Sequence, residues 1–179
     1  MAKRLFDILL ALWALCLFAP FLLALSLLLR LTQPGPVFYG VTRLGYQGRP
    51  FQHWRFRTKF GDPPRTSRTG RLLINSSLDE LPAIWNILRG DLSLVGPRPP
   101  KPEEVDLADP AWPIILSVRP GLMGLGLLRY LERYNETPVA ERIRPDVYYA
   151  QNASLWLDLQ ILARAVPLWL KMGHLKGKV

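Results

Sequence analysis

The longest apolar stretch of the chain runs without a charged residue from Ile8 to Leu29. Its 22 residues are enough for a helix that crosses the hydrocarbon core of a bilayer. Pro20 lies near the middle, where it removes a backbone hydrogen bond and clashes with the carbonyl of Cys16, so the helix is expected to kink there. The pattern leaves two topologies open: a kinked span, or a re-entrant helix that breaks at Pro20 and returns to the same face.

Basic residues flank this run on both sides. Lys3 and Arg4 precede it, and Arg30, Arg43 and Arg49 follow it. With positive charge at both ends, the positive-inside rule gives no reason to place either end outside the cell. Both ends on the cytoplasmic face satisfy the rule. A cleaved signal peptide is the poorer interpretation, because no small-residue cleavage site follows the run.

Shorter patterns follow. The segments 37–39 and 51–57 read as the two strands of a small hairpin around a turn at 45–50. In the second strand Arg55 and Arg57 fall on one face and aromatic residues on the other. The arginines are either a solvated edge or a pair that faces phosphate.

An amphipathic helix is predicted near the end of the chain, over Ser154–Lys171, with Trp156 and Trp169 close to its ends. It either packs on a core or lies in the membrane interface, with the tryptophans at the depth of the headgroups. Together the patterns indicate a mainly helical α+β chain. We expect a membrane-embedded helix over 1–30 and a compact domain over 31–179.

Composition narrows the classes of partner. The net charge is +9, and the basic residues are 17 arginines against 6 lysines. Because the planar guanidinium recognises phosphate oxygens in a bidentate manner, this bias indicates phosphate-bearing partners. One cysteine and two histidines exclude a disulfide framework and zinc sites rich in these residues. The arginines are scattered, and no recognition helix, RNP motif or finger is present, so nucleic acid is not expected as a partner.

The candidate chemistry lies between residues 76 and 99, where Asp79 and Glu80 precede a Leu-Pro pair and a short helical pattern. Proline fits only the first turn of a helix, so that helix should begin near the two acids. One interpretation is a capping box, in which Ser77 caps the helix and Glu80 reaches back to it. The other is a nucleophilic carboxylate with a metal-binding neighbour. Spacing alone favours the cap, but Arg98 follows in a proline-fixed corner that suits a phosphate.

Residues 77–99, SLDELPAIWNILRGDLSLVGPRP, resemble the signature of the bacterial sugar transferase family, the small monotopic phosphoglycosyl transferases. Further matches occur in the order of the family and cover nearly the whole chain: KRLFD at 3–7, GPVF at 35–38, VRPG at 118–121, DVYY at 146–149 and SLWLDL at 154–159. The chain departs from the family pattern at Ala19-Pro20, where Ser-Pro is common, and over 126–133.

The resemblance implies a reaction and a location. A sugar 1-phosphate would pass from a nucleoside diphosphate-sugar, of the UDP-sugar type, to polyprenyl phosphate, with release of a nucleoside monophosphate. The re-entrant helix would hold a catalytic domain on the cytoplasmic face of the bacterial inner membrane. The competing hypothesis is a non-catalytic membrane-anchored scaffold in glycan assembly, in which the acid pair is only a helix cap.

The resemblance also implies roles for residues. Asp79 is expected to attack phosphorus and form an aspartyl phosphosugar, and Glu80 to bind Mg²⁺, a hard cation that prefers oxygen ligands. Asp146 is either a second metal or substrate contact, or a helix cap or ion-pair partner of a nearby arginine. The residues expected to bind phosphate are Arg98 first, Arg119 second, and then Arg55 and Arg57.

Overall fold

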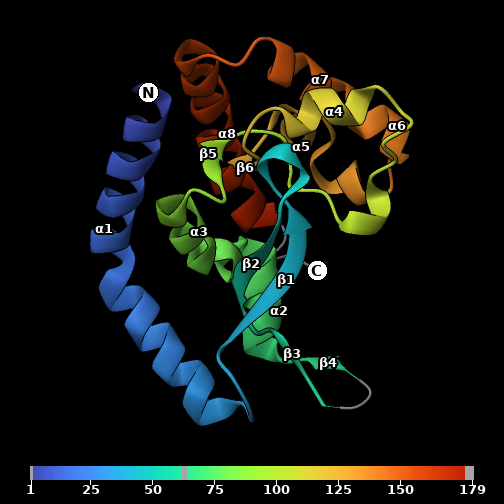
Figure 1. The fold of residues 1–179 in the computed structure, drawn as a ribbon. Coiled ribbons are helices and arrows are strands. Elements are labelled where there is room, and N and C mark those ends of the chain that lie inside the picture. The colour runs from blue at the N-terminus through green and yellow to red at the C-terminus, as the bar shows by residue number, and fades with distance from the viewer. Residues whose placement is uncertain (1, 62–63, 176–179) are drawn as a thin grey trace.

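The computed structural model describes residues 2–61 and 64–175, without the side chains of 132, 135, 166 and 169–175. The chain is mainly helical with three two-stranded sheets, as the α+β prediction expected (Figure 1). The elements are α1 (Ala2–Thr32), β1 (Phe38–Leu44), η1 (Tyr46–Gly48), β2 (Pro50–Phe56), β3 (Lys59–Phe60), β4 (Arg65–Thr66), α2 (Arg68–Ser76), η2 (Leu78–Ala83), α3 (Ile84–Arg89), β5 (Ser93–Val95), η3 (Pro102–Glu104), α4 (Ala111–Leu116), β6 (Gly121–Met123), α5 (Leu125–Tyr130), η4 (Leu131–Asn135), α6 (Val139–Arg142), α7 (Arg144–Gln151) and α8 (Leu155–Leu175).

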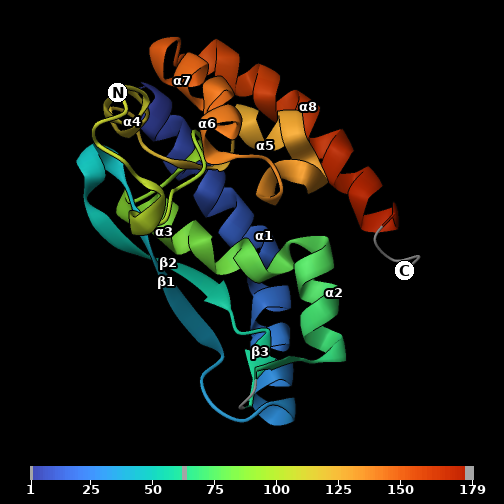
Figure 2. The ribbon, with the colours of Figure 1, turned by 90° about the vertical axis from the view of Figure 1, so that its right-hand side faces the viewer.

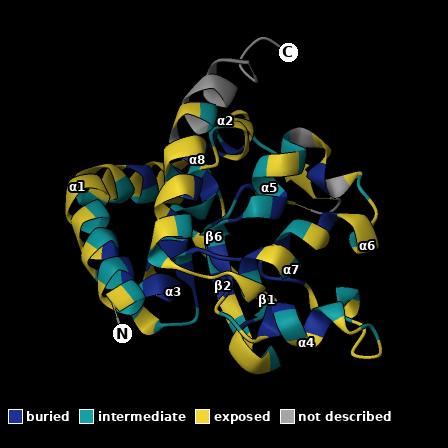
Figure 3. Cartoon of the chain, turned by 90° about the horizontal axis from the view of Figure 1, so that it is seen from above, coloured by how far each residue is buried: buried dark blue, intermediate teal, exposed yellow. Residues whose placement is uncertain are grey.

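The apolar run forms α1, which also includes the polar turn before it. Pro20 lies inside this one helix, and α1 curves along one side of the rest of the chain (Figures 1 and 2). It is the one helix among the described residues that is long and apolar enough to cross a membrane. Only 11% of its most apolar window is buried, and large side chains such as Trp13 and Leu23 are 62% and 72% exposed. Its outer side therefore needs an apolar solvent (Figure 3).

Both halves of α1 pack against the same body. Ala11, before Pro20, is fully buried in one cluster. Leu25 and Leu29, after Pro20, are buried in another. The first half packs against Ile84 and Ile87 of α3 and against two residues that flank this helix, Ala83 and Leu92. The second half packs against Phe56 of β2 and Leu73 of α2. The helix thus lies along the domain.

The first turn of α1 is held by a buried polar network. The Lys3 ammonium donates to the Val95 carbonyl at 3.1 Å, to the Tyr149 hydroxyl at 3.1 Å and to the Asp158 carboxylate. The Tyr149 hydroxyl in turn donates to the other oxygen of Asp158 at 2.6 Å. Asp158 is 1% exposed, so its charge is balanced almost entirely by this lysine. All three ammonium protons have acceptors.

Two more residues of the same turn reach into the domain. Asp7, 2% exposed, accepts hydrogen bonds from the Ser93 hydroxyl at 2.9 Å and from the Leu94 backbone N–H at 3.1 Å. The Arg4 guanidinium donates to two carbonyls in the last turn of α3, at 2.6 and 2.9 Å. The Ile87 carbonyl also accepts from the backbone N–H of Gly90 at 3.1 Å, so the arginine adds to the backbone cap at the end of α3. The turn is therefore bonded to both β5 and α3.

The hairpin is present, with β1 and β2 antiparallel and Phe38 opposite Phe56. A second pairing, parallel between β5 and β6, sets the position of the Pro-Arg-Pro corner. A Cβ atom on Gly121 would lie 2.1 Å from the backbone nitrogen of Gly96, so only glycine permits these strands to approach so closely. The corner that contains Arg98 is thereby fixed against β6.

The predicted C-terminal helix is α8. Ile161 is 1% exposed in a cluster with Val95 and Tyr149, whereas Trp156 is 70% exposed. One face of α8 therefore packs on the core, and Trp156 faces outward. The side chains of Trp169 and Lys171 lie outside the described residues.

Replacing Lys3 by methionine is expected to lower the free energy of unfolding by about 2 kcal/mol. The reason is that Asp158 would keep a buried charge without its cation. The value takes into account that Lys3 is partly exposed to solvent. Thermal unfolding in detergent would measure the change. Lys101→Met is the control, because its pair with Glu103 is 3.7 Å long and exposed on both sides. It should cost less than about 0.5 kcal/mol. Equal losses in the two variants would contradict the prediction.

Candidate active site

The acid pair lies on η2, directly after a reversal of the chain. Ser77 has φ 57° and ψ 17°, the left-handed conformation, and its side chain makes no capping hydrogen bond. The predicted capping box is therefore wrong. The reason is that Ser77 serves the preceding helix instead: its backbone N–H donates to the Ile74 carbonyl at 3.2 Å and ends α2. Asp79 and Glu80 are thus free of a capping role.

Both acids are paired with one guanidinium from the neighbouring strand β2. Arg55 Nη1 lies 3.5 Å from Asp79 Oδ2, and Arg55 Nη2 forms an ion pair and a hydrogen bond with Glu80 Oε1. Asp79 is 6% exposed, while the side chain of Glu80 is 29% exposed. One guanidinium thus pairs with both a half-buried carboxylate and a buried one.

The environment of Asp79 changes its protonation. Burial and, second, the negative charge of Glu80 raise the pKa of Asp79 to about 6, although Arg55 and Arg98 act in the opposite direction. At neutral pH the group is mostly ionised, but it is a stronger base than an ordinary aspartate. Such a carboxylate suits nucleophilic attack without a separate base.

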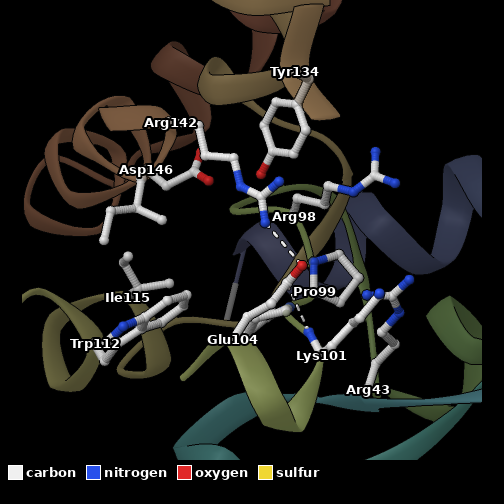
Figure 4. A pocket seen from close by; sticks show the side chains of 12 residues that line it. Arg43, Arg98, Pro99, Lys101, Glu104, Trp112, Ile115, Tyr134, Arg142 and Asp146 are labelled. Atoms are coloured by element: carbon white, nitrogen blue, oxygen red, sulfur yellow. Dashed lines mark hydrogen bonds and ion pairs between the residues drawn. The ribbon is translucent and has the colours of Figure 1, made fainter. Parts of the chain in front are cut away.

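A cavity of about 300 Å³ opens between the Pro-Arg-Pro corner and α4, α6 and α7 (Figure 4). Arg98 and Arg142 lie on the ring of Tyr134, with their guanidinium carbons 5.1 and 5.0 Å from its centroid. Arg142 also pairs with Glu104 at 2.8 Å. Stacking and pairing hold the arginines at fixed positions along the wall, which suits recognition of an anionic ligand.

Asp146 faces the same cavity. It is 3% exposed and accepts a hydrogen bond from the Gly126 backbone N–H at 3.2 Å. Burial raises the pKa of Asp146 to about 7, although this hydrogen bond and the backbone N–H and charge of Arg98 oppose the shift. Among the ion pairs of the described residues, Arg142 pairs with Glu104 and not with Asp146. The acid is thus placed beside Arg98, where a ligand would meet both.

The other two predicted arginines lie elsewhere. Arg119 Nε donates to the Gly90 carbonyl at 3.1 Å, and its guanidinium lies over Tyr46. Arg57 follows the end of β2, and its Nε donates to the Lys59 carbonyl at 3.0 Å. Neither lines a cavity found among the described residues, so the structure brings Arg55 and Arg98 together and leaves these two apart.

Sequence reasoning missed Arg43, His53, Tyr134 and Arg142. Arg43 and His53 share a small second cavity with Arg55, Glu80 and Arg98. The alternation of β2 contains a signal for His53, because residues 51, 53 and 55 share one face of a strand. Tyr134 and Arg142 have no such signal, since the helices that hold them reach the cavity only through tertiary packing.

The carboxylates near the site decide how a magnesium ion could be bound there. Within residues 2–61 and 64–175, no cluster of three or more His, Cys, Asp or Glu side chains could hold a metal. Mg²⁺ commonly takes only one or two protein carboxylates and completes its shell with water and substrate phosphates. The adjacent carboxylates of Asp79 and Glu80 fit that mode, and they do not fit an all-protein cage.

The raised pKa of Asp79 predicts a pH-dependent effect of Asp79→Asn on stability. Above pH 6 the wild type holds a buried charge that the amide lacks, so the variant should be more stable at pH 8 by about 2 kcal/mol after solvent screening is allowed for. The advantage should shrink as pH falls through 6 and vanish below the ordinary range of aspartate, where both forms are neutral. Thermal unfolding from pH 4 to 8 would test this. A difference that does not change with pH would contradict it.

Known proteins resemble this chain over nearly its whole length. The sequence matches the family described as bacterial sugar transferase over residues 1–172. It is 37% identical to the exopolysaccharide production protein ExoY of Rhizobium meliloti, covering 93% of this chain and 84% of that protein. It is 40% identical to a UDP-glucose:undecaprenyl-phosphate glucose-1-phosphate transferase of Caulobacter vibrioides, over 92% of this chain and 68% of that protein. A third relative, the UDP-N-acetylgalactosamine-undecaprenyl-phosphate N-acetylgalactosaminephosphotransferase of Aeromonas hydrophila, is 35% identical over 92% of this chain and 42% of its own length. The chain therefore belongs to the bacterial sugar transferase family and is a transferase.

Proposed function

We propose that this enzyme transfers a sugar 1-phosphate from a UDP-sugar to polyprenyl phosphate and releases UMP. The observation that carries the proposal is the buried carboxylate of Asp79, paired with Arg55 beside Glu80, which lines a small cavity together with Arg43 and Arg98. The names of the relatives from Caulobacter vibrioides and Aeromonas hydrophila support the same donor and acceptor classes.

The reaction proceeds in two displacements at one phosphorus. An Asp79 carboxylate oxygen attacks the phosphorus that bears the sugar, the bond to the bridging oxygen breaks, and UMP leaves with that oxygen. A phosphate oxygen of the polyprenyl acceptor then attacks the same phosphorus, which releases Asp79 and gives polyprenyl diphosphate-sugar. Both nucleophiles are oxyanions at neutral pH, so neither step needs a general base.

The surrounding residues stabilise and orient the charged groups. Mg²⁺, held by Glu80 beside Asp79, would supply charge neutralisation at the diphosphate oxygens. Arg98 binds a phosphate from its proline-fixed corner, and Asp146, beside it, contacts the donor in the same cavity. Arg57 and Arg119 each use Nε–H for a backbone carbonyl, and they play no part in this proposal because neither lines the cavities that contain Arg55 and Arg98.

The contacts of α1 support a re-entrant topology on the cytoplasmic face of the inner membrane. Lys3 at one end binds Asp158, and Gln33 just past the other end donates to the Ser67 hydroxyl at 3.0 Å. A body that contains loops and open sheet edges cannot lie within hydrocarbon, so both ends belong on one side. The site is then held at the height of the lipid phosphate, which keeps its tail in the bilayer.

Asp79→Asn is expected to lower turnover by on the order of 10³-fold or more, because the amide cannot form the covalent intermediate. The assay is release of nucleoside monophosphate from a panel of nucleotide-sugars in the presence of polyprenyl phosphate. Circular dichroism would establish that the variant is folded. Unchanged turnover would favour the scaffold hypothesis, and release of a nucleoside diphosphate would contradict the mechanism.

Single cysteines at Ala2 and Gln33, introduced into a Cys16→Ala background, should react with a membrane-impermeant maleimide from the same side of the membrane. Inverted inner-membrane vesicles should expose both positions, and intact spheroplasts neither. Arg65→Cys on β4 is the reference for the side of the domain. Labelling of one end in vesicles and of the other in spheroplasts would show a spanning helix.

A further inference from the structure

The three residues whose buried side-chain nitrogens have no hydrogen-bond partner among the described residues all line the small cavity beside the acid pair. These nitrogens are Arg43 Nε, Arg55 Nε and both ring nitrogens of His53. Buried polar groups are rarely left without partners, and four in one place are far from chance. We call this cavity the nitrogen niche; its wall includes Arg43, His53, Arg55, Glu80 and Arg98. Such a concentration of donors indicates a ligand that accepts hydrogen bonds.

The charge of the nitrogen niche favours an anion. Arg43, Arg55 and Arg98 bring three positive charges to its wall, against the single carboxylate of Glu80. His53 is 3% exposed, and burial and the neighbouring arginines lower its pKa to about 3, so it is neutral. A neutral imidazole donates through one nitrogen and adds no further charge to the crowded guanidiniums.

The size of the nitrogen niche limits what can enter. Its volume is about 10 Å³, room for one oxygen-sized atom and not for a whole phosphate. The cavity of about 300 Å³ shares Arg43, Arg98 and Pro99 with it, so the two spaces adjoin. A phosphate in the larger cavity can place one oxygen in the niche while its other substituents remain outside.

The geometry of Arg55 links this oxygen to the nucleophile. Its two terminal nitrogens are used by Asp79 and Glu80, and its Nε–H is the one without a partner. A guanidinium donates in several fixed directions at once. An oxygen in the niche can therefore bind Arg55 without breaking either ion pair, and it is then held at a fixed distance from Asp79.

We propose that His53 and Arg43 bind a non-bridging phosphate oxygen of the diphosphate donor in the nitrogen niche. This inference rests on the proposed function for the identity of the donor. It adds His53, on strand β2, as a binding residue that orients the diphosphate toward Asp79. The binding of the anion itself can be measured without turnover.

The test uses the full chain in detergent, with inorganic pyrophosphate as the probe and EDTA present, so that no metal is required. His174→Gln removes the only other histidine, and ¹⁵N-labelled histidine then reports on His53 alone. Saturating pyrophosphate is expected to shift the ring nitrogen signals of His53. His53→Leu should weaken pyrophosphate binding about tenfold by calorimetry, the effect of losing one hydrogen bond to a charged group.

Two controls separate binding from folding. His53→Leu replaces buried nitrogens that lack protein partners, so without pyrophosphate its melting temperature should equal or exceed that of the parent protein. Gln52→Leu changes the exposed neighbour on the other face of β2, where Gln52 bonds Thr42. It should leave pyrophosphate affinity unchanged.

The outcomes distinguish this inference from the proposed function. If the parent protein releases UMP but His53→Leu binds pyrophosphate as tightly as the parent, the inference is overturned and the transferase mechanism stands. If His53 signals do not move while calorimetry shows saturation, the niche is likewise not the binding site. Binding that depends on His53 in a protein that transfers no sugar phosphate would support the anion site and defeat the proposed donor.

Discussion

The rest of the structure depends on the polar first turn of α1. An apolar helix with an exposed outer side would by itself have no fixed position on its domain, because apolar packing has little directionality. Lys3 and Asp7 supply that direction, since each is hydrogen-bonded to residues in β5 and Lys3 also to Asp158. The helix that the bilayer solvates is thereby fixed in register with the strand that leads into the Pro-Arg-Pro corner.

The same network reaches the cavity through α7. Tyr149 of this helix bonds the Lys3 ammonium and Asp158, while Asp146, one turn earlier, faces Arg98 and Gly126. A rigid helix of eight residues thus connects the buried end of α1 with an acid of the site. The same short helix therefore takes part both in the anchoring of α1 and in the wall of the cavity.

The site concentrates charge that burial makes costly. Asp79 and Asp146 both have pKa values well above the ordinary range, and His53 has one well below it. Each shift records the free energy of removing a charge from water, which folding must supply from packing elsewhere. Apolar residues at these three positions would stabilise the fold more than the ionisable groups do. His53 and Asp146 line two adjoining cavities, and Asp79 lies beside Glu80, which lines the smaller one; this grouping of costly charges indicates function.

The sequence alone determined the features that follow from local pattern. The uncharged run, the alternation of the hairpin and the residues 77–99 were sufficient to predict a long apolar helix, a mainly helical α+β fold and the family. The capping-box interpretation of Ser77 was wrong. Ser77 ends α2 instead, and periodicity cannot show which of two adjacent helices a residue between them will cap. Spacing alone also could not show that Arg98 lines the cavity and Arg119 does not. That difference depends on the pairing of β5 with β6, after which Arg119 bonds the Gly90 carbonyl. Arg43, His53 and Arg142 join the site only when strands and helices far apart in the chain pack together. The sequence determines what each segment can form, and tertiary packing alone decides which charged side chains share a cavity and which of them are removed from water.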